Sequence, residues 1–430
     1  MALKHRQLLC SGAWTVKLLP IFMFFSLYLG WEWQVQAQPF AYVTNQLDNT
    51  VSVINTASNK VTDTINVGIG PVGIAITPNG QFAYVTNSRD GSVFVIETSS
   101  NTVTDTVNVG DGPVGIAITP DGQFTYVTNQ FYNSILVIET SSNTITDTVN
   151  VGDGPAGIAI TPDGQFAYVA NRDDNTVSVI ETFSYIVSDT VHVGDAPIDL
   201  VITPDGQFAY VMNIDDGTVS VIRTDNNMVI ETVNVGNAPV DVVITPDGQF
   251  AYVTNFSDSS VSVIEIASNT VVTTVNVGNA PVGIAITPDG KFAYVANRDD
   301  NTVSVIETAS NTVTDDVNVG SQPTLIAITL TPTAIESVEG EAPTVFTLEQ
   351  NYPNPFNLST NIKYGVAKSD YVKLAVYNLI GEEVSVLVNG HADAGFYEIE
   401  FNAAYLPSGI YFYKLQAGDF IETKKMVLLR

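Results

Sequence analysis

The chain has 430 residues, more than a single hydrophobic core usually serves, and its formal net charge at pH 7 is -29. Only 14% of the residues are charged, so the acidity comes from a shortage of Lys and Arg and not from acidic runs. A surface this negative repels phosphate backbones, which argues against nucleic acid as a partner.

The first segment in chain order, residues 1–37, has the pattern of a signal peptide. A basic start precedes the 12 apolar residues Leu18–Leu29, and Val35–Ala37 offers small side chains for cleavage before Gln38. Twelve residues are too few for a transmembrane helix, which takes about 20, although an uncleaved membrane anchor is the alternative. Cleavage would remove the only cysteine, Cys10, and all three tryptophans. The mature chain is then predicted to have no transmembrane segment, no disulfide and no thiol nucleophile.

Residues 38–331 repeat one motif seven times at a spacing of 42 residues. Each period contains four strand-like runs rich in Val, Ile, Thr and aromatic residues, as in "FAYVTN", "SVFVIET", "NTVTDTVNV" and "GIAIT" of the second copy. The phenylalanine that begins the first run marks the period at Phe40, Phe82, Phe124, Phe166, Phe208, Phe250 and Phe292. A small four-stranded sheet cannot bury both of its apolar faces alone, and radial stacking of seven such sheets buries them. The repeat therefore predicts an all-β, seven-bladed β-propeller with four-stranded blades.

The phase of the repeat predicts how the ring closes. The chain enters at Phe40 and leaves after Ile326–Thr329, so the first copy lacks a preceding "GIAIT" strand and the last such strand has no following blade. Pairing of these N- and C-terminal strands would complete the first blade and remove the open edge.

The segments "FAYVTN", "NTVSVIET" and "PVGIAITPDG" resemble the YVTN family of β-propeller repeats, with all four strands in order over about residues 39–331. That family is similar in fold to lactonase-like and surface-layer propellers. The Phe and Tyr of each "FAYV" are expected in the core between blades. The Glu residues that recur at the end of "VIET" are expected to have a surface role at the strand end.

After a linker at residues 332–344, residues 345–430 are expected to form a second domain. Six or seven short alternating strands predict a small Ig-like β-sandwich. The segments "NYPNPFNLSTNIKYGV", "VKLAVYNLIGEEV", "SGIYFYKLQAGDF" and "KKMVLLR" resemble the type A sorting domain of the type IX secretion system. The resemblance implies recognition by the type IX secretion machinery and release from, or attachment to, the outer surface of a Gram-negative cell. An ordinary C-terminal adhesive sandwich is the alternative.

The best candidate site is a departure from the repeat. The third residue of "PVGIAIT" is glycine in most copies but Asp199 and Asp241 in two successive ones, and Asp195 is close to the first in sequence. These carboxylates are expected at the mouth of the propeller channel, where they could hold a cation such as Ca²⁺ or stay merely solvated. The propeller histidine His192 replaces Asn at an outer strand end and predicts only a polar substitution there.

The residues favour an exported, non-enzymatic binding or surface-structural protein without a cofactor, because no His and Cys catalytic set can be assembled. The propeller would be a rigid display scaffold for an unidentified protein, carbohydrate or small-molecule ligand. Adhesion to a polysaccharide is a third possibility. The absence of exposed Trp weakens it, although Tyr and Phe in loops such as "NQFYNS" (Asn129–Ser134) could substitute. The alternative is a secreted lactonase-like hydrolase that uses a metal at the acidic channel mouth.

Overall fold

The computed structural model describes residues 39–329, 336–338 and 343–429, except the single positions 358, 369, 382, 393, 404, 405, 407 and 419. The predicted signal peptide and most of the predicted linker therefore lie outside the described residues. Regular structure in the described part is β-strand apart from one short 3-10 helix, η1 (Phe256–Asp258). Within the same part, no helix is long and apolar enough to cross a membrane.

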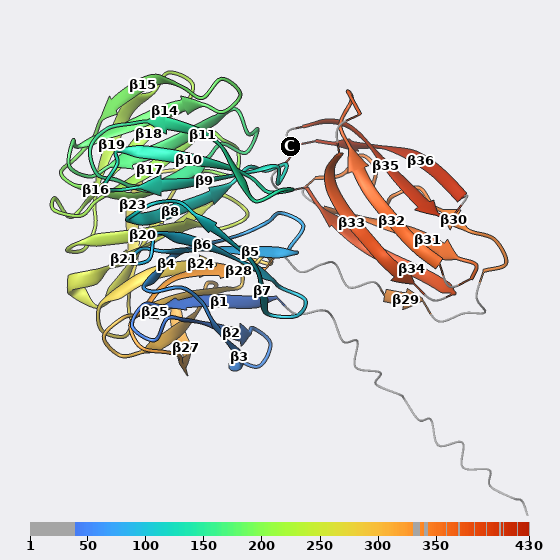
Figure 1. The fold of residues 1–430 in the computed structure, drawn as a ribbon, viewed down its shortest axis with the longest axis horizontal. Helices are drawn as coiled ribbons and strands as arrows, with labels where there is room; N and C mark the ends of the chain where they lie inside the picture. Colours follow the sequence, from blue (N-terminus) through green and yellow to red (C-terminus); the bar gives the residue numbers. More distant parts are fainter. Residues whose placement is uncertain are drawn as a thin grey trace, which may run out of the picture. The chain divides into compact units, whose positions relative to one another are not determined.

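Strands β1 to β28 form seven four-stranded antiparallel sheets, the blades, which follow one another in chain order (Figure 1). The innermost strands contact each other around the ring. They are β28 (Pro323–Ile328), β4 (Pro71–Ile76), β8 (Pro113–Ile118), β12 (Pro155–Ile160), β16 (Pro197–Ile202), β20 (Pro239–Ile244) and β24 (Pro281–Ile286). The second strands are β1 (Phe40–Asn45), β5 (Phe82–Asn87), β9 (Phe124–Asn129), β13 (Phe166–Asn171), β17 (Phe208–Asn213), β21 (Phe250–Asn255) and β25 (Phe292–Asn297).

The two outer positions of each blade complete the four-stranded unit that the repeat predicts. The third strands are β2 (Thr50–Asn55), β6 (Ser92–Glu97), β10 (Ser134–Glu139), β14 (Thr176–Glu181), β18 (Thr218–Arg223), β22 (Ser260–Glu265) and β26 (Thr302–Glu307). The outer strands are β3 (Lys60–Asn66), β7 (Thr102–Asn108), β11 (Thr144–Asn150), β15 (Ile186–His192), β19 (Met228–Asn234), β23 (Thr270–Asn276) and β27 (Thr312–Asn318). The prediction of seven blades is confirmed.

The ring closes as the phase of the repeat predicts. Strand β28, the last of the propeller, pairs antiparallel with β1, the first, so that Ile328 lies opposite Ala41 and Ile326 opposite Val43. The first blade is thus built from both ends of the repeat region. Closure completes the first blade, so that each of the seven blades has four strands.

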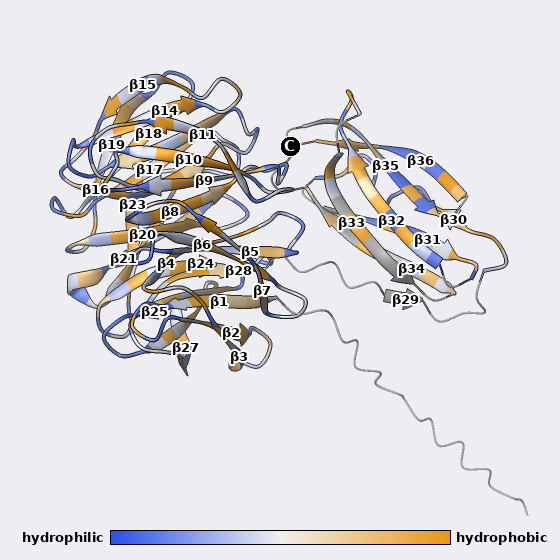
Figure 2. Cartoon of the chain, in the orientation of Figure 1, coloured by the Kyte–Doolittle hydropathy of each residue, from blue (hydrophilic) through white to orange (hydrophobic). Residues whose placement is uncertain are grey.

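The aromatic residues of the repeat pack between blades to different depths. The seven tyrosines of the second strands are at most 1% exposed, whereas the phenylalanines two residues earlier are half-buried and pack at the borders of the same clusters. Figure 2 shows hydrophobic residues along the propeller strands and hydrophilic ones in many of the connections. Alternation along each strand therefore supplies apolar faces to both neighbouring blades.

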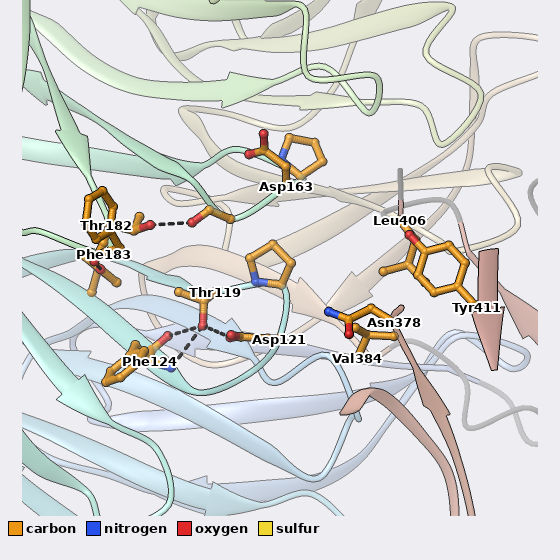
Figure 3. A pocket seen from close by; sticks show the side chains of 14 residues that line it. Thr119, Asp121, Phe124, Asp163, Thr182, Phe183, Asn378, Val384, Leu406 and Tyr411 are labelled. Atoms are coloured by element: carbon orange, nitrogen blue, oxygen red, sulfur yellow. Dashed lines mark hydrogen bonds between the residues drawn. The ribbon is translucent and has the colours of Figure 1, made fainter. Parts of the chain in front are cut away.

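The "TPDG" segments form the turns from innermost to second strands, and the third blade shows the pattern (Figure 3). The Thr119 hydroxyl donates to Asp121 Oδ1 at 2.6 Å and accepts the Phe124 N–H at 3.0 Å. Gly122 has a φ of +72°, which glycine adopts without strain. The turn residues therefore have the structural roles that their types predict.

The C-terminal strands form a separate sandwich of two sheets, as predicted. One sheet has the order β29 (Glu336–Val338), β34 (Gly395–Asn402), β31 (Ser359–Val366) and β30 (Thr347–Leu348). The other has the order β33 (Glu383–Ala392), β32 (Asp370–Tyr377), β35 (Gly409–Ala417) and β36 (Phe420–Leu428). The hydrophobic core of the sandwich contains residues of both sheets, including Ile362, Leu374 and Leu415, each 0% exposed.

Candidate functional site

The third position of the innermost strands is crowded by the next blade. A Cβ on Gly73 would lie 2.2 Å from the Val114 carbonyl oxygen, and one on Gly115 would lie 2.2 Å from the Ala156 carbonyl oxygen. In these copies glycine allows the backbones of neighbouring blades to approach closely. The aspartates at this position in β16 and β20, like Leu325 in β28, therefore need a different local arrangement.

Asp199 and Asp241 lie on neighbouring innermost strands, and their side chains are hydrogen-bonded to each other. Asp241 is 8% exposed and Asp199 is partly buried. Asp199 Oδ1 accepts the Leu200 N–H at 2.8 Å. Asp241 Oδ1 accepts the Val242 N–H at 2.7 Å, and its Oδ2 accepts the Ile284 N–H of the next blade at 2.8 Å. The pair therefore links three consecutive blades beside the channel.

The electrostatics of this pair favour a single shared proton. Burial raises the pKa of Asp199 well above its usual range, and the negative charge of Asp241 raises it further. Burial also raises the pKa of Asp241, while the hydrogen bonds from Asp199 and from two backbone N–H groups oppose this rise. A hydrogen bond between two carboxyl groups requires one proton. Because the pKa of Asp199 is raised more strongly, a proton shared by the pair would reside on Asp199, with Asp241 as its acceptor.

The third predicted ligand, Asp195, is not part of this pair. Asp195 is exposed, its Oδ1 accepts Asn175 Nδ2 at 2.9 Å, and its N–H donates to Asp216 Oδ2 at 2.7 Å. Over the described ranges, no three His, Cys, Asp or Glu side chains lie close enough together to hold a metal ion. The predicted set of three carboxylates is therefore not assembled. Asp241 already uses both oxygens for N–H groups, whereas Ca²⁺ takes six to eight oxygen ligands, so the pair is a poor fit for that ion.

The glutamates at the ends of the third strands make contacts within the scaffold. Ser100 donates to Glu97 Oε2 at 2.6 Å, and Ser142 donates to Glu139 Oε2 at 2.6 Å, so these glutamates close the turn after their own strand. His192 is the exposed last residue of β15, opposite Thr176. Its place agrees with the prediction of a polar substitution at a strand end.

Sequence reasoning placed several aspartates at the face on which the innermost strands begin, here called the proline face, but did not predict their role. In six of the seven blades, an aspartate in the loop between the second and third strands accepts a backbone N–H from the loop before that blade's innermost strand, at 2.6 to 2.7 Å. The pairs are Asp48 with Ser321, Asp90 with Ile69, Asp174 with Asp153, Asp216 with Asp195, Asp258 with Asn237, and Asp300 with Asn279. We call this contact the aspartate clamp. Its signal was the recurrence of Asp at 42-residue spacing.

A second missed set joins the blades through the buried tyrosines. In six blades the tyrosine hydroxyl donates to an asparagine Oδ1 of the next blade at 2.5 to 2.7 Å. The pairs are Tyr42–Asn101, Tyr84–Asn143, Tyr168–Asn227, Tyr210–Asn269, Tyr252–Asn311 and Tyr294–Asn59. The last pair closes the ring. In the remaining blade Tyr185 replaces the asparagine, and Tyr126 donates to the Thr182 carbonyl oxygen at 3.2 Å.

Comparison with solved structures finds many chains of similar fold. Hydrazine synthase of Kuenenia stuttgartiensis is 25% identical with a TM-score of 0.55, covering 59% of this chain and 88% of that chain. A Desulfotomaculum acetoxidans protein of unknown function is 22% identical with a TM-score of 0.61, covering 67% and 98%. A candidate 6-phosphogluconolactonase of Bacteroides fragilis is 19% identical with a TM-score of 0.59, covering 68% and 98%. The last two likenesses show the fold alone.

Comparison with protein families assigns both parts of the chain, whereas no curated protein matches it. The secretion system C-terminal sorting domain matches residues 350–429, so the chain is directed to the cell surface or the extracellular space through the type IX system. The YNCE-like beta-propeller matches residues 33–333, and these residues include all seven blades. The chain therefore belongs to the YNCE-like beta-propeller family and ends in a secretion system C-terminal sorting domain.

Proposed function

We propose that this protein is an exported, non-enzymatic binding or surface-structural protein whose propeller is a rigid scaffold for ligand-binding loops. The observation that carries the proposal is the use of the recurring polar side chains. The tyrosine hydroxyls, the clamp aspartates and the strand-end glutamates are all engaged in contacts within or between blades. The recurring polar side chains thus make the propeller rigid. The residues that differ between copies lie largely in loops, where binding residues are commonly placed.

Delivery is the second part of the proposal. The sorting domain would be recognised by the type IX secretion machinery, and the propeller would reach the outer surface of a Gram-negative cell. Fractionation of native cells with intact-mass analysis tests this. We expect a mature protein that starts near Gln38 in the cell-surface or medium fraction, and the mass will report whether residues 345–430 are removed. Full-length protein retained in the cytoplasm would contradict the proposal.

A secreted hydrolase is the alternative, and the Asp199–Asp241 pair favours it. One neutral and one charged carboxyl group at hydrogen-bond distance could act as general acid and general base. A candidate 6-phosphogluconolactonase also has a similar fold. Binding of Ca²⁺ at the channel mouth would require the contacts of Asp241 with the Val242 and Ile284 N–H groups to reorganise. Asp195 would then be the nearest further carboxylate to Asp199 in the sequence.

The two functions are separated by an activity assay and a melting assay on the same protein. We expect no hydrolysis of a phosphorylated sugar lactone above background and no shift of Tm in calcium. A cation at 100 times its Kd would stabilise the fold by about 2.7 kcal/mol, which is readily measured. Lactone hydrolysis that is lost in Asp199→Asn and in Asp241→Asn, but kept in Asp195→Asn, would establish the hydrolase instead.

A further inference from the structure

One blade departs from the aspartate clamp on the proline face. At the position of the clamp aspartate, the third blade has Tyr132, preceded by Phe131. The loop before its innermost strand is Gly110–Asp111–Gly112, and the Asp111 N–H therefore has no clamp aspartate to bond. This loop pair is the one interruption of the ring of clamps described above.

The two aromatic side chains are exposed and rest on the glycine loop. Phe131 is 72% exposed and Tyr132 is 59% exposed. A Cβ on Gly112 would lie 2.5 Å from Phe131 Cδ2, and one on Gly110 would lie 3.4 Å from Tyr132 Cε2. Both glycines also have positive φ, +77° and +80°. Part of each ring therefore contacts the backbone of the glycine loop, and most of its surface is exposed to solvent. We call Phe131 and Tyr132 the aromatic platform.

Polar groups stand beside the platform. Asp111 is exposed between the two glycines, and among the described residues its carboxylate has no hydrogen-bond partner. On the other side, the Asn133 carboxamide is fixed, because its Oδ1 accepts the Gly154 N–H at 3.1 Å and its Nδ2 donates to Asp153. An unbonded carboxylate therefore lies in the glycine loop that contacts the two rings, and the residue after Tyr132 is held by the next blade.

We infer that the aromatic platform binds a neutral glycan, an inference that rests on the proposed binding function and names its ligand class. The C–H face of a sugar ring stacks on an aromatic face, and its hydroxyl groups suit the carboxylate and N–H of Asp111. Rings that are already supported lose little conformational entropy on binding.

Size and charge decide against other ligands. A stable protein partner usually covers about 800 Å² on each side, far more than two side chains offer, whereas one or two sugar rings match their extent. The net charge of -29 opposes acidic polysaccharides and anionic lipid surfaces. A neutral chain of hexoses is the remaining class with both an apolar face and hydroxyl groups.

Titration of the full mature chain with neutral hexasaccharides tests the inference. The probes are cellohexaose, laminarihexaose and mannohexaose, with polygalacturonate as the acidic counterpart, and binding is followed by calorimetry. We expect at least one neutral probe to bind, Phe131→Ala with Tyr132→Ala to weaken it at least tenfold, and Asp111→Ala to weaken it severalfold. Because all three side chains are exposed, each variant is expected to keep the wild-type Tm.

The matched control is Phe183→Ala, which removes an aromatic side chain that is 86% exposed at the opposite end of the fourth blade. It should leave glycan affinity unchanged. Unchanged binding in the platform double variant would overturn the inference while leaving a binding scaffold in place. Failure of every neutral probe, or stronger binding of polygalacturonate or of anionic vesicles, would also overturn it. Lactone hydrolysis would instead refute the proposed function.

Discussion

The substitution Asp199→Asn tests the shared proton between two blades. Asparagine has nearly the shape of a protonated aspartate, and its Nδ2 can donate to the Asp241 carboxylate without a titratable proton. The contacts of Asp241 with the backbone N–H groups of Val242 and Ile284 would remain. The variant therefore removes the titration of one side chain and little else.

The expected effect follows from the direction of the pKa shift. The pKa of Asp199 is higher in the folded chain than its unfolded value of about 3.9, so folding favours the protonated carboxyl group. This contribution is fully present below the unfolded pKa and is lost as the pH rises through the folded pKa. The loss is up to about 1.4 kcal/mol per pH unit. Asp199→Asn should therefore gain stability over the wild type as the pH rises, and the gain should level off above the folded pKa.

Urea denaturation of both proteins at half-unit steps from pH 4.5 to 8 measures this difference. The other carboxylates are common to both proteins, so subtraction removes their contribution. Asp195→Asn, which changes an exposed aspartate outside the pair, is the control and should show no such trend. A stability difference between Asp199→Asn and the wild type that stays constant over this range would refute the shared proton.

Three further predictions concern stability, each measured by urea denaturation. Tyr294→Phe removes the hydrogen bond that closes the ring and leaves its asparagine acceptor unpaired, so it should lower the free energy of unfolding by about 1 to 2 kcal/mol. Tyr126→Phe should cost less, because the Tyr126 hydroxyl bonds only a carbonyl oxygen at 3.2 Å. Equal costs would contradict the role of the asparagine. Thr125 is 0% exposed, and its hydroxyl has no partner among the described residues. Alanine occupies this position in the other six copies, so Thr125→Ala should stabilise the fold by about 1 kcal/mol. A loss of stability would mean that the hydroxyl is hydrogen-bonded. Gly73→Ala should destabilise it by about 2 to 3 kcal/mol, because its Cβ would meet the Val114 carbonyl oxygen, and a neutral result would show that the blades can separate there.

Much of the fold could be predicted from local chemistry. The spacing of Phe40, Phe82 and their equivalents fixed the number of blades, and the phase of the repeat predicted the pairing of β28 with β1. These predictions succeeded because each blade has the length of one repeat, and because each pair of neighbouring blades packs through equivalent residues. The adjacency of Asp199 and Asp241 followed from the same regularity.

The candidate site could be predicted only in part. Sequence placed Asp195 with the pair because it is four residues from Asp199, yet a bulge and a turn send its side chain to Asn175 and the solvent. The tyrosine to asparagine bonds span 59 residues, and 235 at the ring closure, so no local pattern reveals them. Distances between side chains on different blades depend on how closely the blades pack.

The sequence by itself determined the blade, its turns, the sevenfold count and the closing pair, because strand period, turn residues and an exact repeat are local properties of the chain. Only the tertiary structure decided which polar groups meet. It brought the two channel aspartates together, engaged six loop aspartates as clamps, and left Phe131 and Tyr132 exposed over two glycines. These outcomes depend on how closely neighbouring blades pack, because a hydrogen bond forms only when donor and acceptor come within a narrow range of distances.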